Sequence, residues 1–291
     1  FPYDPIIRQT PGRRGIWGDC QFYINSEIDD CDYWVVYNGV SQPETAWCPP
    51  QNTILITGEP PSILDYPATY TRQFARVVTC HRHISHPRLI LNQTGLSWHT
   101  GRVLVDIKNC QSIINRDYDD FKDMHTLPKS KLMSVITSSK DFTEGHQKRL
   151  NFVRKLKDYF GEDIDVFGRG IREVDDKWDA LSPYKYHIAL ENSVYPHYWT
   201  EKLGDVYLSG AYPIYYGCPN LGDYFPAASY TRINIDNIEG AIRTIEECIR
   251  ERRYEASLDR IIEARNLVLD HYNLFALITK LVREPLPTKK R

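Results

Sequence analysis

The segment that decides the fold spans residues 186–219 and reads YHIALENSVYPHYWTEKLGDVYLSGAYPIYYGCP. Its first five residues form a largely apolar run, which predicts a strand buried on both faces. A polar turn at Glu191-Asn192 follows, and a helix is expected over 200–209 because Thr200 can act as its N-cap. A second strand over 211–216 ends in a Gly/Pro turn. This order predicts neighbouring parallel strands joined by a right-handed crossover.

The same alternation extends along the rest of the chain. In the second half, short apolar runs and 3–4 spacing predict further elements: strands at 132–137 and 165–168, and helices at 145–160, 238–249 and 258–282. In the first half, apolar runs separated by prolines predict strands at 33–37, 53–57 and 76–80. The sequence therefore predicts an α/β protein of two Rossmann-like domains that face each other across a cleft. We place the N-terminal domain at 1–127 and the C-terminal domain, with its terminal helices, at 128–291.

The composition excludes several classes of protein. A net charge of −2 over 291 residues argues against a protein that follows nucleic acid by bulk electrostatics. With 42% hydrophobic and 25% charged residues, the chain has the composition of a soluble globular protein. The seven cysteines are odd in number, scattered and without a CxxC pair. They indicate reduced thiols rather than a disulfide framework or a zinc site.

The sequence also bears on location. No run of 18 apolar residues predicts a membrane span, and no signal peptide is visible, so we expect a cytoplasmic protein. The chain begins at Phe1 rather than Met, which leaves a missing N-terminal segment open. The basic tail at 285–291 has two interpretations: a frayed terminus, or a peripheral contact with anionic lipid at the inner membrane face.

The central segment has the properties of a nucleotide diphosphate site. A helix that begins near Thr200 presents free N–H groups and the positive end of its dipole, and Lys202 adds a formal charge there. The sequence around this turn is not a P-loop. We therefore expect the diphosphate to be held by a helix N-terminus and by cationic side chains that converge on it.

Three pieces of this segment together resemble a known family. Glu191-Asn192-Ser193, then Trp199-Thr200-Glu201-Lys202-Leu203, then the run GAYPIYYGCP at 210–219 look like the signature of the inverting fucosyltransferases that use GDP-fucose and make alpha-1,3 linkages. The bacterial members look nearer than the animal ones. The resemblance implies the GT-B fold, and it is strongest over residues 191–219 and thin in the N-terminal half.

The resemblance also implies roles for individual residues. Asn192 and Tyr198 would contact the nucleotide–sugar region, Glu201 would lie by the ribose or the fucosyl ring, and Lys202 would bind the diphosphate. Arg149 matches the position of a second cation on the pyrophosphate. In the DVFGR segment, Gly168 would permit a close approach of the backbone.

Each of these residues has an ordinary structural alternative. Lys202 and Arg149 suit a solvated helix surface, and Glu201 suits an ion pair along a helix. Tyr198 suits a core, and Asn192 suits a turn. Their joint occurrence favours the donor site. Two cations on a departing diphosphate would stabilise its developing charge without a metal ion.

An inverting transfer also needs a base for the attacking hydroxyl. The resemblance implies a carboxylate after a strand of the N-terminal domain, and Glu59 in Thr57-Gly58-Glu59-Pro60 has this position. A glutamate in a proline-stiffened turn is the alternative. For the acceptor, Trp98 and His99 are the candidates, because their segment lies where the family has another recognisable one.

Two patterns raise the question of a metal ion. His81, His83 and His86 could approach one ion, but no carboxylate or cysteine in the sequence completes that set. The D-x-D patterns at 117–119 and 163–165 resemble those of metal-dependent transferases, yet they are common in a chain with 38 acidic residues. We expect no metal and no other cofactor.

The predicted function is that of a fucosyltransferase. It would transfer fucose from GDP-fucose to a hydroxyl of an oligosaccharide or glycoconjugate with inversion, in glycan synthesis or protein glycosylation. Its partners would be the nucleotide-sugar donor and the acceptor, without nucleic acid. A transferase with another nucleotide sugar and an inert glycan- or nucleotide-binding relative are the alternatives.

Overall fold

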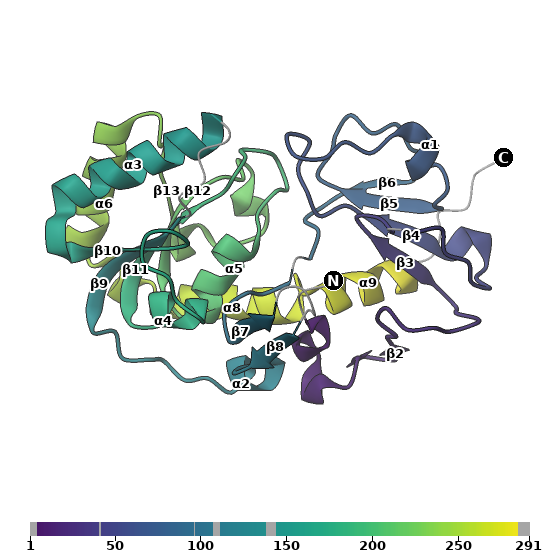
Figure 1. Ribbon diagram of the computed structural model, residues 1–291. Coiled ribbons are helices and arrows are strands. Elements are labelled where there is room, and N and C mark those ends of the chain that lie inside the picture. Colours follow the sequence, from purple (N-terminus) through teal and green to yellow (C-terminus); the bar gives the residue numbers. More distant parts are fainter. Residues whose placement is uncertain (1–4, 41, 96, 107–110, 138–143, 285–291) are drawn as a thin grey trace.

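Two parallel β-sheets organise the molecule (Figure 1). The computed structural model describes residues 5–40, 42–95, 97–106, 111–137 and 144–284. The first sheet has the strand order β3-β4-β5-β6, with strands Trp34–Tyr37, Thr53–Ile56, Arg76–Thr79 and Leu89–Leu91. All its pairs are parallel. Ile54, Leu55 and Val77 are fully buried, as the continuous apolar runs predict.

The second sheet has five parallel strands in the order β10-β9-β11-β12-β13. These are Lys131–Ile136 (β9), Ile164–Phe167 (β10), Tyr184–Leu190 (β11), Tyr212–Tyr216 (β12) and Thr231–Arg232 (β13). From β9 the chain moves to one side, to β10, and then returns across β9 to β11. A topological switch point therefore lies between β9 and β11, where open α/β sheets bind ligands at the strand carboxyl ends.

Helices cover both faces of the second sheet. On one face, Phe152 and Leu156 of α3 (Glu144–Phe160) share a core with Ile245 of α6 (Ile238–Arg250). On the other face, Leu203 of α5 (Glu201–Leu208) packs with Val268 of α8 (Leu258–Asp270). The shorter helices are α1 (Ala68–Thr71), α2 (Tyr118–Lys122), α4 (Lys177–Leu181) and α7 (Arg253–Ala256).

The last helix, α9 (Leu274–Arg283), returns to the first sheet (Figure 1). Leu274, Phe275, Leu277, Ile278 and Leu281 pack there with apolar side chains of the strands β4 and β5. The single helical region predicted at 258–282 is therefore two helices. It is interrupted at 271–273, where the Asn273 side chain caps α9 by accepting from the Phe275 N–H at 3.1 Å. The predicted domain boundaries stay a prediction.

Two antiparallel pairs complete the described strands: β1 (Ile16–Trp17) with β2 (Cys20–Gln21), and β7 (Arg102–Asp106) with β8 (Gln111–Ile114). The sequence reasoning did not predict these pairs, nor β6, β13, α2 and α4, because the elements are short or only partly buried. Within the described ranges, no helix is long and apolar enough to cross a membrane. The basic tail at 285–291 lies outside the described residues.

Candidate active site

A cavity of about 280 Å³ lies at the switch point of the second sheet. Its walls come from the carboxyl ends of β9, β10 and β11 and from the helices that follow them. The lining residues are Ile136, Thr137, Arg149, Gly168, Arg169, Lys177, Leu181, His187, Ala189, Leu190, Asn192, Lys202 and Asp205. Arg149 and Lys202, 53 positions apart in the sequence, thus share one pocket with two further cations. Its position and its charge suit an anionic ligand.

Arg149 enters this pocket from α3 and is only 8% exposed. Its Nη1 donates to the Asn192 Oδ1 at 2.6 Å, while its Nε is buried without a hydrogen-bond partner. No described carboxylate forms an ion pair with it. Burial lowers the pKa of Arg149, but a guanidinium remains charged in proteins. A buried cation with a free donor is costly unless an anion joins it.

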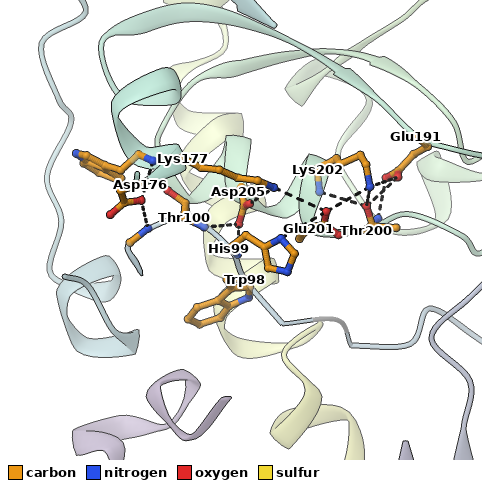
Figure 2. Close-up of polar contacts among 12 residues, drawn as sticks. Trp98, His99, Thr100, Asp176, Lys177, Glu191, Thr200, Glu201, Lys202 and Asp205 are labelled. Atoms are coloured by element: carbon orange, nitrogen blue, oxygen red, sulfur yellow. Dashed lines mark hydrogen bonds and ion pairs between the residues drawn. The ribbon is translucent and has the colours of Figure 1, made fainter. Parts of the chain in front are cut away.

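Lys202 lies in the first turn of α5, beside the fully buried carboxylate of Glu191 (Figure 2). Glu191, directly after β11, accepts hydrogen bonds from the Thr200 N–H and hydroxyl, both at 2.8 Å. The Lys202 Nζ lies 3.2 Å from the Glu201 carboxylate and 3.8 Å from that of Glu191. Burial alone would lower the pKa of Lys202, but these two carboxylates raise it, so the lysine stays charged.

Glu201 lies within ion-pair distance of side chains from three segments. In addition to Lys202, its carboxylate is 3.7 Å from the Lys177 Nζ and 3.7 Å from the His99 Nδ1. Burial would raise the pKa of Glu201, yet Lys202, His99 and Lys177 hold it well below its usual range. Its predicted role beside the ribose or the fucosyl ring stays a prediction. In this structure Glu201 organises the cations of the site.

Asp205, one turn after Glu201, joins the loop at 98–100 to α5 (Figure 2). Its Oδ1 accepts from the backbone N–H groups of His99 and Thr100, at 2.9 and 3.1 Å, and its Oδ2 is 3.2 Å from the Lys177 Nζ. Sequence reasoning missed Lys177, Asp205 and His187. The one available signal was the spacing of Glu201 and Asp205, which places both carboxylates on the same face of a helix.

Glu59 lies three residues after the end of β4 in the first sheet, outside the lining of the cavity. It is half-buried, and burial raises the pKa of its carboxyl group while the nearby Lys202 opposes that rise. The proposed base is therefore within electrostatic reach of the proposed diphosphate cation. A 2.6 Å hydrogen bond between the hydroxyls of Ser62 and Ser193 also joins the two segments that follow Glu59 and Asn192.

The two acceptor candidates have different surroundings. Trp98 is 2% exposed and packs edge-on against Phe121, with ring centroids 5.8 Å apart. Its assignment to the acceptor stays a prediction, which this packing does not favour. His99 is more accessible: its side chain is 38% exposed, and its Nδ1 lies 3.7 Å from the Glu201 carboxylate. Tyr198 is 4% exposed and does not line the pocket.

Gly168 is required by a close approach within the protein itself. Its φ is +136°, and an added Cβ would lie 1.5 Å from the Thr137 carbonyl oxygen. Only glycine allows the carboxyl ends of β9 and β10 to approach so closely at the pocket wall.

The acidic D-x-D patterns lie outside the pocket. Asp117 caps α2 and lies 2.5 Å from the Arg13 Nε, and Asp165 pairs with Lys131 and Arg172. These carboxylates therefore have structural partners, and neither lines the cavity.

Two parallel sheets covered by helices, with a cationic pocket at the switch point of the second sheet, correspond to the GT-B fold. Two crystal structures support this fold: an alpha1,3-fucosyltransferase with GDP (TM-score 0.50, 16% identity, 82% of this chain and 79% of that one) and one with GDP-fucose (TM-score 0.50, 15%, 94% and 98%). The predicted fold class is confirmed.

The sequence comparison is more specific. Residues 126–244 match the family model "Glycosyltransferase family 10 (fucosyltransferase) C-term", so this part of the chain is similar to the C-terminal domain of that family. The matched segment includes Arg149, Glu191 and Lys202. The predicted resemblance is confirmed for this part of the chain.

Individual relatives come from animals and bacteria. The chain is 31% identical to the GDP-fucose protein O-fucosyltransferase 3 of Bos taurus, over 27% of this chain and 19% of that protein. It is 35% identical to the alpha-(1,3)-fucosyltransferase FucT of Helicobacter pylori, over 25% and 16%. It therefore spans a fifth or less of these relatives.

Proposed function

We propose that this protein transfers fucose from GDP-fucose to a hydroxyl group of a glycan or glycoconjugate, with inversion at the anomeric carbon. The observation that carries the proposal is the pocket shared by Arg149 and Lys202 inside the segment that matches the fucosyltransferase family. The structures with GDP and GDP-fucose support the same fold, and the donor is inferred from the family.

In the proposed reaction, the donor diphosphate lies against Arg149 and Lys202. The acceptor hydroxyl attacks the anomeric carbon from the face opposite GDP, and Glu59 accepts its proton. The C–O bond to the diphosphate breaks, and the two cations stabilise the charge that develops on the leaving GDP. This scheme needs no metal ion on the diphosphate, because the side-chain cations supply the positive charge.

The unpaired donor of Arg149 supports this scheme. The Arg149 Nη1 donates to the Asn192 side-chain oxygen, but the buried Nε has no hydrogen-bond partner. A phosphate oxygen that accepted from this Nε would remove the cost of burying an unsatisfied donor. Lys202 would exchange part of its pairing with Glu191 and Glu201 for the diphosphate.

The names of the relatives support two acceptors. The Helicobacter pylori relative and a Drosophila melanogaster relative, alpha-(1,3)-fucosyltransferase B at 46% identity over 16% of this chain and 10% of that protein, favour an alpha-1,3 linkage to a glycan. The Bos taurus relative favours a hydroxyl of a protein. We place the glycan first because the predicted signature is that of the alpha-1,3 enzymes.

The donor is tested by thermal denaturation with GDP-fucose, GDP-mannose and UDP sugars in parallel. A ligand at 100 times its dissociation constant stabilises the folded state by about 2.7 kcal/mol. We expect a large shift with GDP-fucose and GDP, and none with UDP sugars. Stabilisation by a UDP sugar alone would overturn the proposed donor.

Turnover is tested by release of GDP with oligosaccharide and peptide acceptors. Acceptor-dependent release with an oligosaccharide supports the first proposal, and release with a peptide supports the second. Tight GDP binding without release for either acceptor would indicate an inert nucleotide-binding relative.

A further inference from the structure

A second group of ligand-type side chains lies beside the Glu59 turn. Asp65 follows β4, and His81 and His83 follow β5, so adjacent parallel strands bring them to the same edge of the first sheet. One ligand atom from each residue lies within 4.8 Å of the other two. The sequence reasoning lacked a carboxylate for these histidines, and Asp65, 16 positions earlier, supplies it. His86 instead contacts the Phe74 carbonyl and the Arg88 N–H.

His81 is the fixed member of this group. Its side chain is fully buried, and its Nε2 lies 2.8 Å from the backbone carbonyl oxygen of Glu59. Because a carbonyl oxygen only accepts, Nε2 must carry the proton of this bond, and Nδ1 therefore keeps its lone pair. That Nδ1 is buried without a hydrogen-bond partner. Burial also lowers the pKa of His81, which favours the neutral imidazole that a metal ion requires.

Asp65 and His83 are the adjustable members. Their side chains are 75% and 52% exposed, and the Asp65 Oδ1 lies 3.1 Å from the His83 Nε2. An exposed ion pair of this kind contributes little to the stability of the fold. It also does not explain why the buried Nδ1 of His81 has no hydrogen-bond partner. Bonds of about 2.0–2.2 Å to a tetrahedral ion place its ligands roughly 3.3 Å apart. Small rotations of the two exposed side chains would close that distance.

We propose that Asp65, His81 and His83 bind one divalent transition-metal ion of the Zn²⁺ class, with water completing the coordination. Two imidazoles and a carboxylate suit such ions better than Mg²⁺ or Ca²⁺, which prefer oxygen ligands alone. This site is separate from the donor pocket, whose lining includes none of the three residues. It is also distinct from the D-x-D carboxylates.

The ion would act on the Glu59 turn through His81. A histidine that binds a metal through one nitrogen commonly donates from the other to a carbonyl or carboxylate, which fixes both groups. Here the second group is the Glu59 backbone, so a bound ion holds the turn that presents the proposed base. This consequence rests on the proposed function, whereas the binding of the ion does not.

Binding is tested by titrating the metal-free protein with Zn²⁺ in competition with a chromophoric chelator. The test variants are Asp65→Asn and His83→Gln, because both side chains are exposed and tolerate substitution. His125→Gln, another exposed histidine, is the matched control. We expect one equivalent of tightly bound Zn²⁺, an affinity at least 10-fold lower in each test variant, and no change in the control.

Co²⁺ substitution gives an independent readout, since a visible spectrum that disappears in His83→Gln identifies the histidine as a ligand. Equal affinity for Zn²⁺ in wild type and both test variants would overturn the site, as would the absence of tight binding in wild type. Circular dichroism shows whether each variant is folded.

The effect on Glu59 is tested separately, by fucose transfer before and after removal of the ion. We expect kcat to fall on removal and to recover with Zn²⁺, while GDP affinity is unchanged. Unchanged kcat in a protein that binds Zn²⁺ would overturn the effect on the base. If no fucose is transferred to any acceptor, the proposed function fails, but the Zn²⁺ titration still shows whether Asp65, His81 and His83 bind the ion.

Discussion

The two sides of the candidate active site are built differently. On the donor side, buried carboxylates lie beside two of the cations: Glu191 lies 3.8 Å from the Lys202 Nζ, and Asp205 lies 3.2 Å from the Lys177 Nζ. On the base side, Glu59 is half-buried, and among the described residues no hydrogen bond or ion pair reaches its carboxylate. A fixed set of cations suits the binding of a diphosphate, whereas an unpaired carboxylate suits the transfer of a proton.

Glu59→Gln gives the sharpest test of this difference. The amide keeps the shape of the side chain but cannot take up the proton of the attacking hydroxyl group. We therefore expect kcat for fucose transfer to fall about 10²–10⁴-fold. GDP affinity, measured by calorimetry, should stay within about twofold of wild type. Glu44→Gln, on an exposed glutamate of the same half, is the control. Full activity in Glu59→Gln would exclude it as the base.

Gly168→Ala tests the wall of the donor side. The added Cβ would meet the Thr137 carbonyl oxygen, at a φ of +136° that alanine rarely adopts. We expect a loss of about 3 kcal/mol in the free energy of unfolding, measured with urea. Gly161→Ala is a control, because no atom lies within 4 Å of its added Cβ, although its φ of +53° leaves a smaller cost. Equal losses in the two variants would contradict the proposed close approach.

Arg149→Ala tests the anion-binding role. A hydrogen bond to a charged group contributes about 1.5–3 kcal/mol to the free energy of binding. Without it, GDP should bind about 10- to 100-fold more weakly, as measured by calorimetry. Arg154→Ala, on the exposed side of the same helix, should bind like wild type. If both variants kept wild-type affinity, the diphosphate would have to lie elsewhere.

The pH dependence of kcat/KM sharpens the base side further. Glu59 must be ionised to accept a proton, and burial raises its pKa. Activity should therefore be present above that raised pKa and decrease as the pH falls through it. The midpoint of this acid limb should lie above about 4.3, the ordinary value for glutamate, and the limb should be absent from the residual activity of Glu59→Gln. A midpoint at or below the ordinary value would contradict the role of burial.

The sequence predicts the donor side better than the base side, for a physical reason. Parallel strands buried on both faces leave continuous apolar runs, so β9, β10, β11 and β12 lie within two residues of their predicted positions. Of the functional groups in this half, Lys202 lies in the contiguous motif, and Arg149 lies on α3, which the sequence predicts at 145–160.

Contacts between distant segments leave no comparable signal. Lys177 reaches Glu201 and Asp205 only because α4 and α5 pack together, and Asp65 approaches His83 only because β4 and β5 are neighbours. The core position of Trp98 was hidden for the same reason, since its partner Phe121 lies in a helix that the sequence did not predict.

The return of α9 to the first sheet constrains how the two halves of the molecule can move. The chain passes between the two sheets once after β8 and again through residues 271–273, so a rotation of one half against the other must bend the backbone at both places together. Two connections between the halves favour rotation of one half about a single axis over rotation in any direction. It also means that a fragment ending at Asp270 would uncover Ile54, Ile56 and Val78, and would lose the first domain as well as the last helix.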